Sequence, residues 1–289
     1  MPLTPLQRSV ARAIAINRSP GSHLAGGAAI HLGKGTLRTS DDLDYFHDEE
    51  QLVAQAFAAD RSALEGAGFT VMPTLSQPGF IRALVASTKG ETKIEWAHDS
   101  SWRFMPPIRD PIVGYRLHPV DLSINKILAL AGRDEPRDFL DAIFVHERYL
   151  SLGALCWAAV GKDPGYSPGL LVEMLARKGK YQAADFLPLK LAAQPDLLRL
   201  KREWINAIAD ARLLVQRLPP IDAGCLYLDP ERKKFVTPGA DLDRLIRHHG
   251  SKGGVIPMIG DGPALTADAN SRRLLRERYG GQAPTDSRR

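Results

Sequence analysis

Two aspartates, Asp42 and Asp44, are separated by one residue in the segment LRTSDDLDYF, which otherwise alternates like a β-strand. Side chains two residues apart on a strand project from the same face, with Cα atoms roughly 6–7 Å apart. Two neighbouring carboxylates repel each other, and a bound cation or a proton relieves that repulsion. The spacing therefore predicts a divalent metal site, and we expect the metal to bind a nucleoside triphosphate.

A glycine pair precedes these acids in the chain. Gly26 and Gly27 lie where a short strand is expected to turn into a helix. Glycines permit a tight turn there, and its N–H groups can face phosphate oxygens. A carboxylate pair after such a turn is typical of two-metal phosphoryl transfer, with the ions about 4 Å apart. We expect two Mg²⁺ ions, with Mn²⁺ as the alternative, because Mg²⁺ prefers few carboxylates plus substrate phosphates.

A third carboxylate is expected from a neighbouring strand. Glu95 lies in the segment KIEWAHD between Ile94 and Trp96. An acidic residue bounded by large apolar neighbours is expected to point away from the core. We therefore predict that Glu95 is the third metal ligand or a catalytic base, rather than an ordinary exposed glutamate. Asp99 is the substitute candidate.

Further candidates lie in the helical second part of the chain. Lys126 occupies an otherwise apolar helix, so it either extends its ammonium to the helix boundary or reaches the nucleotide phosphates. We favour the phosphate contact. Asp138 and Asp141 are three apart and share a helix face. They are interpreted as nucleotide-site groups, with structural clamps between helices as the alternative, and Arg137 could pair with Asp141.

The elements that must position these residues can be predicted from periodicity and turn residues. Helices are expected at 5–17, at 48–68, repeatedly between 118 and 217, and at 239–250, with a basic helix at the end of the chain. Strands are expected at 38–46, 69–76, 80–87 and 92–99, and a hairpin at 224–238. The pattern predicts an α+β fold with a small mixed sheet.

Three domains are expected from this order. Residues 1–110 form the α/β domain, residues 111–218 form a helical domain that completes the active site, and residues 219–289 form a basic C-terminal region with a hairpin and helices. A proline-rich break, RLPPIDAG, precedes the third.

Composition narrows the class of protein. The chain has 289 residues, of which 44% are hydrophobic. It has two cysteines, and so small a number excludes a disulfide framework and suits a reducing cytoplasm. We expect neither a secretory signal nor a membrane span. The net charge of +5 equals the 12 basic minus 7 acidic residues after position 230. A basic end region is typical of a polyanion partner such as RNA, although a solvated tail has the same composition.

The segments LAGGAAIHL…LRTSDDLDYF, TKIEW and HPVDLSINKILALAGRDEPRDFLDAIFV together resemble the AbiEii family of abortive-infection nucleotidyltransferase toxins. That family includes the MenT-type toxins of mycobacteria and belongs to the DNA polymerase beta-like nucleotidyltransferase superfamily. The resemblance covers about residues 20 to 150. The Gly-Gly…Asp-x-Asp pattern is shared by the superfamily, whereas Arg-x-Ser-x-Asp-Leu-Asp and the lysine helix followed by Arg-Asp-x-x-Asp are more specific.

The resemblance implies a function and one more site residue. Ser40 would contact the nucleotide beside the metal, while the glycines cradle the triphosphate and Asp138 or Asp141 completes the site. Members transfer a nucleoside monophosphate from an NTP and release pyrophosphate. In several of them the acceptor is the tRNA 3′ end, and a cognate antitoxin is typically encoded beside the toxin.

Two other classes of function stay open. Glu91 and Lys93 form a Glu-x-Lys pattern that, with an upstream aspartate, occurs in some metal-dependent nucleases. A non-catalytic RNA-binding protein would explain the basic end region. A separate hypothesis is that phosphorylation of Ser40 places nearly two negative charges beside the metal site and switches the enzyme off.

Overall fold

The computed structural model describes residues 3–32, 36, 38–259 and 262–263. Its largest sheet has seven strands in the order β3-β4-β5-β2-β1-β8-β7. These strands are β1 (Ser22–Ala25), β2 (Asp42–His47), β3 (Thr70–Gln77), β4 (Phe80–Ser87), β5 (Gly90–His98), β7 (Ile108–Asp110) and β8 (Gly114–Arg116). The sheet is mixed, because β2 runs parallel to β5 and antiparallel to β1. The predicted α+β class is confirmed.

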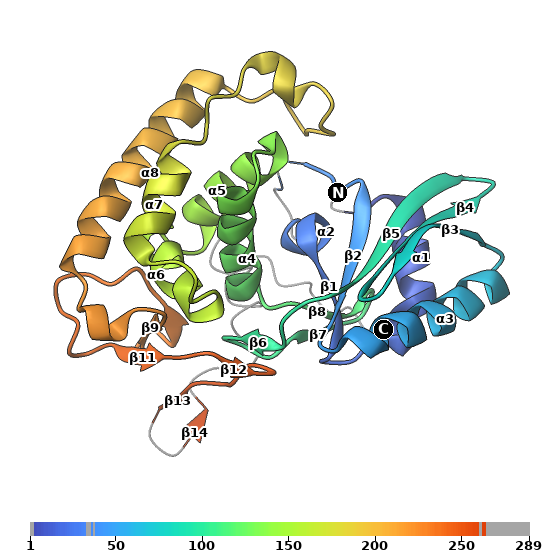
Figure 1. The fold of residues 1–289 in the computed structure, drawn as a ribbon, viewed down its shortest axis with the longest axis horizontal. Coiled ribbons are helices and arrows are strands. Elements are labelled where there is room, and N and C mark those ends of the chain that lie inside the picture. The colour runs from blue at the N-terminus through green and yellow to red at the C-terminus, as the bar shows by residue number, and fades with distance from the viewer. Residues whose placement is uncertain (1–2, 33–35, 37, 260–261, 264–289) are drawn as a thin grey trace, which may run out of the picture.

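Three helices pack around this sheet. Helix α1 (Pro5–Ile14) starts with a capping box between Thr4 and Gln7, which satisfies two of the N–H groups that a helix start leaves unpaired. Helix α3 (Glu50–Gly66) packs with α1 against β5, whereas the short α2 (Gly26–Ile30) lies between β2 and helix α4 (Pro119–Gly132). Figure 1 shows α3 and α2 on opposite sides of the strands. The sheet is thus joined to the helical part through α2.

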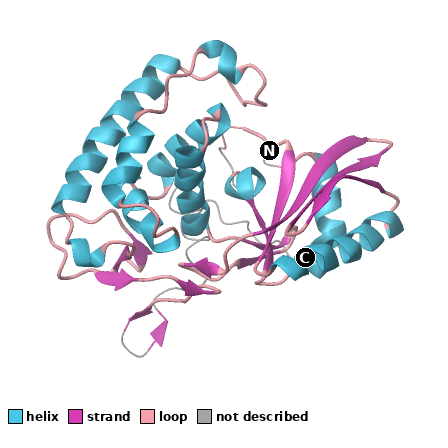
Figure 2. Cartoon of the chain, viewed as in Figure 1, coloured by secondary structure: helices cyan, strands magenta, loops and turns pink. Residues whose placement is uncertain are grey.

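The second part of the chain is helical, as predicted. Helix α4 is followed by α5 (Pro136–Arg148), α6 (Leu152–Lys162), α7 (Pro168–Ala176) and α8 (Leu197–Arg217). These helices gather on one side of the molecule and the long strands on the other (Figure 2). Short 3₁₀ turns lie at Ala15–Asn17, Ala183–Phe186 and Pro220–Asp222. Among the described residues, no helix has the combination of length and apolar composition that crossing a bilayer requires.

The C-terminal region contains short strands. Strands β9 (Leu226–Asp229) and β10 (Lys234–Phe235) form the predicted hairpin. The helix predicted at 239–250 is wrong, because Ile246–His248 is strand β11, which pairs with β9. Pairing with a buried strand has overridden the helical spacing. The predicted terminal basic helix lies outside the described residues.

The last strands return to the first part of the chain. Strand β12 (Ser251–Lys252) pairs with β6 (Trp102–Arg103), and β13 (Met258–Ile259) pairs with β14 (Gly262–Pro263). The seven-stranded sheet also continues to Arg116, past residue 110. The limits of the three predicted domains stay a prediction.

Candidate functional site

The site is built on the parallel pair β2 and β5. Their register places Asp44 opposite Glu95 and Asp42 opposite Lys93. The residues between them on each strand, such as Leu43 and Ile94, face the other way and are fully buried in the core. The alternation of apolar and charged residues therefore directs all four charged side chains to one face of the sheet.

Three carboxylates lie close together on this face. Asp42, Asp44 and Glu95 each offer an oxygen within 4.8 Å of the others, the one such acidic group in the described part of the chain. An ammonium partly neutralises them, because Lys93 Nζ lies 3.0 Å from Asp42 Oδ2 and 3.2 Å from Glu95 Oε1. Arg82 Nε donates to Glu95 Oε1 at 2.9 Å. Within the described residues, the Asp44 carboxylate has no such partner.

The two aspartates differ in protonation. Burial, together with the charges of Asp42 and Glu95, raises the pKa of Asp44 to about 7. Burial acts in the same direction on Asp42, but the contact with Lys93 and the hydrogen bond from Ser40 outweigh it and lower its pKa. A carboxylate with a raised pKa beside two like charges is the electrostatic environment that a divalent cation relieves.

The glycine turn lies directly against these acids. Gly26 has a φ of +61°, and a Cβ built there would lie 1.8 Å from Asp44 Oδ2. A Cβ at Gly27 would lie 2.7 Å from Arg38 Nη2 and 2.8 Å from Ser40 Oγ. Glycine is therefore needed at the first position for conformation and at both positions for space.

Substituting Gly26 gives a sharp test of this close approach. We expect Gly26→Ala to displace Asp44 and to weaken Mg²⁺ binding at least tenfold, and the left-handed backbone adds a cost of about 1–2 kcal/mol. Isothermal titration with Mg²⁺ and thermal unfolding would measure the two effects. Gly169→Ala is the control, because a Cβ at that helical position meets nothing within 4 Å. Unchanged Mg²⁺ binding in Gly26→Ala would contradict the geometry.

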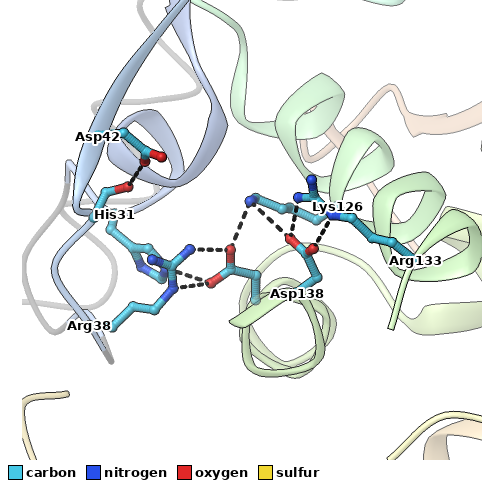
Figure 3. Close-up of polar contacts among 8 residues, drawn as sticks. His31, Arg38, Asp42, Lys126, Arg133 and Asp138 are labelled. Atoms are coloured by element: carbon cyan, nitrogen blue, oxygen red, sulfur yellow. Dashed lines mark hydrogen bonds and ion pairs between the residues drawn. The ribbon is translucent and has the colours of Figure 1, made fainter. Parts of the chain in front are cut away.

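Basic side chains from the helical part face the carboxylates. Lys126 Nζ lies 2.8 Å from Asp141 Oδ2 and 3.6 Å from Asp138 Oδ1, and Arg133 pairs with Asp138 (Figure 3). Arg38 donates from Nε and Nη2 to the two oxygens of Asp141 at 2.9 and 2.7 Å. The two buried aspartates therefore fix three cations in place.

A cavity of about 330 Å³ separates the carboxylates from these cations. It is lined by eighteen residues, among them Gly26, Gly27, Arg38, Ser40, Asp42, Asp44, Arg82, Lys93, Glu95, Asn125, Lys126, Arg133 and Arg137. Its volume and its polar lining fit a nucleotide-sized ligand. One wall carries the acidic cluster, and another carries the ammonium and guanidinium groups.

The structure separates two groups of predicted site residues. The glycines, Ser40, the three acids and Lys126 line one cavity, whereas Asp138 and Asp141 do not line it. Their side chains are 0% exposed and hold cavity cations, which matches the clamp alternative. Asp99 is bound to Lys162 at 3.1 Å and lines a neighbouring cavity instead. Ser40 donates to Asp42 Oδ1 at 2.9 Å and is 2% exposed, so a kinase would need the segment to open.

Several cavity residues were missed in the sequence. Arg38, Arg82 and Arg133 contribute guanidinium groups, and the sequence pattern places Lys93 only in a nuclease motif. The period-two spacing of Lys93 and Glu95 on β5 was a usable signal, because it puts both on one face. Arg38 opens the Arg-x-Ser-x-Asp-Leu-Asp segment, whereas the positions of Arg82 and Arg133 depend on tertiary contacts that leave no local pattern.

The three carboxylates fit a divalent metal. They supply hard oxygen ligands of the kind that Mg²⁺ prefers, and Asp44 is unpartnered on the cavity wall among the described residues. Lys93 pairs with the other two, but its side chain is 33% exposed, which leaves room for the ammonium to move aside. Asp42, Asp44 and Glu95 are therefore the residues that would hold the ion.

Comparisons with known proteins give similarity to solved structures alone. No protein-family model matches the chain, and no curated protein matches its sequence. Among solved structures, JHP933 from Helicobacter pylori is similar, with 20% identity, a TM-score of 0.45 and coverage of 73% of this chain and 91% of that one. MenT4, a nucleotidyltransferase toxin from Mycobacterium tuberculosis, is also similar, with 15% identity, a TM-score of 0.45 and coverage of 72% and 92%. The geometry of the site is therefore the basis for its function.

Proposed function

We propose that this chain is a metal-dependent nucleotidyltransferase. It would transfer a nucleoside monophosphate from an NTP to an acceptor hydroxyl and release pyrophosphate. The observation that supports this most strongly is the convergence of Asp42, Asp44 and Glu95 on the wall of a cavity that Lys126 and Arg133 also line. Acids that hold metal, opposite cations that neutralise phosphates, are the parts that phosphoryl transfer requires.

The residues of this chain position and neutralise the triphosphate. The turn at Gly26 and Gly27 would bring backbone N–H groups against phosphate oxygens. Lys126 and Arg133, oriented by the buried aspartates, would bind the β- and γ-phosphates and the leaving pyrophosphate. Mg²⁺ bound to the acids would neutralise phosphate charge and lower the pKa of the acceptor hydroxyl. Catalysis would consist mainly of positioning and charge neutralisation.

The proposed acceptor is the tRNA 3′ end, and the proposed biological role is that of the toxin in a toxin–antitoxin pair. The basic surplus after residue 230 supports a polyanionic acceptor. The resemblance of the Arg-x-Ser-x-Asp-Leu-Asp segment to the AbiEii toxins supports the biological role and a cytoplasmic location.

Label transfer tests the reaction. Purified protein with Mg²⁺, α-labelled NTPs and total tRNA is expected to label the RNA, and Glu95→Gln is expected to label it at least 100-fold more slowly. Glu91→Gln is the matched control, because Glu91 lies on the same strand but does not line the cavity. Equal rates in all three proteins would refute the assignment of Glu95.

The position of Glu91 disfavours the nuclease alternative. That hypothesis needs Glu91 near the aspartates, whereas Glu91 is exposed, pairs across the strands with Ala86 and lies outside the acidic cluster. We expect no Mg²⁺-dependent cleavage of RNA when NTP is omitted. Gel analysis of intact tRNA after incubation would check this.

The raised pKa of Asp44 predicts that Mg²⁺ binding depends on pH. Below pH 7 the carboxyl is largely protonated in the metal-free protein and must lose its proton before it can bind the ion. Affinity should therefore rise by up to about tenfold per pH unit between pH 5 and 7, and level off above that range. Titration calorimetry in buffers of different ionisation enthalpy measures the released proton. The same proton release in Asp44→Asn would contradict this prediction.

A further inference from the structure

A second cavity, of about 370 Å³, lies at the N-terminal end of α4. Its walls come from the start of α4, the end of α5 and strand β10, which belongs to the basic C-terminal region. Arg148, Arg232 and Lys234 line it, and none of the described residues around it is acidic. Three basic residues in a lining that has no acidic residue favour an anion.

His118 adds a buried donor to this cavity. Its Nδ1 accepts a hydrogen bond from the Val120 N–H at 3.2 Å, and burial lowers the pKa of the ring to about 3, so the ring is neutral. The proton must then sit on Nε2, which is buried and has no hydrogen-bond partner. His118 is 3% exposed and lines the cavity. An unpaired buried donor is destabilising, and an acceptor oxygen that reached it from the cavity would relieve that cost.

The basic side chains are held at the rim in different ways. Arg148 stacks over the Phe144 ring with 4.8 Å between Cζ and the ring centroid, and Arg232 Nε lies 3.5 Å from Asp229 Oδ2. The Lys234 backbone pairs with Asp229 in the β10–β9 ladder, but its ammonium has no hydrogen-bond or ion-pair partner among the described residues. Its ammonium is therefore available to an external anion. The neighbouring Lys233 is exposed and does not line the cavity.

We propose that this second cavity binds a backbone phosphate of an RNA strand. The buried His118 donor and the Lys234 ammonium match phosphate oxygens, and a strand rather than a small anion is favoured because the cavity belongs to the basic C-terminal region. Only the role of that strand as the acceptor depends on the proposed function. His118 precedes Lys126 by eight residues, roughly 12 Å along the helix axis. An RNA whose end occupies the first cavity carries several phosphates over that distance.

A matched pair of variants tests the site. Lys234→Gln and Lys233→Gln remove the same charge from adjacent positions, so their long-range electrostatic effects are similar. Fluorescence anisotropy of labelled tRNA between 50 and 200 mM KCl should show several-fold weaker binding in Lys234→Gln. The slope of log affinity against log salt concentration should be smaller in this variant, by the amount that about one phosphate contact contributes. Lys233→Gln should keep the wild-type slope. Equal slopes in both variants, or no RNA binding by the wild type, would overturn the proposal.

The same samples separate this proposal from the proposed enzyme activity. Circular dichroism melting first checks that both variants fold, and Mg²⁺-dependent NTP binding should be unchanged in both. If the wild type transfers no nucleotide but binds RNA through Lys234, the enzyme assignment fails and the RNA site stands. If transfer occurs and the Lys234→Gln variant binds RNA like the wild type, the RNA site fails alone.

Discussion

Asp42→Asn is expected to abolish nucleotide transfer, with a loss of at least 1,000-fold, while the chain still folds. The substitution keeps the shape of the side chain and the hydrogen bond from Ser40, but removes one of the three charges that would hold the metal. It also removes the ionic partner of Lys93, whose ammonium is 33% exposed and can turn to water. The loss should therefore appear in the rate of transfer and not in the melting temperature.

Asp41→Asn is the matched control for this result. Asp41 is the adjacent residue, but its side chain is 53% exposed and pairs with Lys190 at 2.7 Å, away from the acidic cluster. Its substitution should change transfer by less than about twofold. If Asp42→Asn keeps more than a tenth of the wild-type rate, the proposed role of the acidic cluster is wrong.

Asp141→Asn is expected to have the largest effect on stability, a loss of about 3–5 kcal/mol. The carboxylate is fully buried and accepts hydrogen bonds from His31 at 2.8 Å and from Arg38, while Lys126 lies 2.8 Å away. An amide cannot neutralise the two buried cations, and its NH₂ group would face donors. Urea unfolding at pH 7 measures the loss.

Asp138→Asn controls for the loss of a buried carboxylate on the same helix. Its closest partner is Arg133, whose side chain is 50% exposed, so water can compensate part of the lost charge. We expect this variant to lose less stability than Asp141→Asn. Equal losses would mean that burial of the carboxylate, and not its three partners, sets the cost.

The pKa of Asp141 predicts a dependence of stability on pH. Burial alone would raise the pKa of Asp141, but the charge of Lys126 and the hydrogen bonds from His31 and Arg38 outweigh it and hold the pKa well below the usual value near 3.8. Because the pKa is depressed in the folded state, the stabilisation is fully present above the unfolded pKa near 3.8. It is lost as the pH falls from there through the lower pKa of the folded state. Wild-type stability should drop in that acidic range, and Asp141→Asn should drop less.

The acidic cluster could be predicted because its signal is local. Period-two alternation predicts that the side chains of Asp42, Asp44 and Glu95 point away from the core. The three carboxylates then meet if the two strands pair in the correct register. The register itself joins segments about fifty residues apart, and no pattern in the sequence encodes it. The same limit applies to the pairing of β11 with β9, which turned a segment with helical spacing into a strand.

The basic wall of the cavity could not be predicted in the same way. The spacing of four residues makes Arg137 a possible partner of Asp141. Arg137 instead lines the cavity, and the partners of Asp141 are His31, Arg38 and Lys126. Two of these partners come from the segment between β1 and β2, more than a hundred residues away in sequence. Such pairs depend on the packing of α2 against α4 and of α4 against α5.

Manganese binding tests the central claim most directly. Electron paramagnetic resonance of free Mn²⁺, titrated with protein in the presence and absence of ATP, CTP, GTP or UTP, counts the bound ions. Without nucleotide, wild type and Asp41→Asn should bind Mn²⁺, whereas Asp42→Asn should leave nearly all of the Mn²⁺ free. With at least one of the nucleotides, wild type and Asp41→Asn should remove more free Mn²⁺ than the nucleotide alone does, and Asp42→Asn should not. Equal binding by the three proteins would place the metal elsewhere and contradict the account.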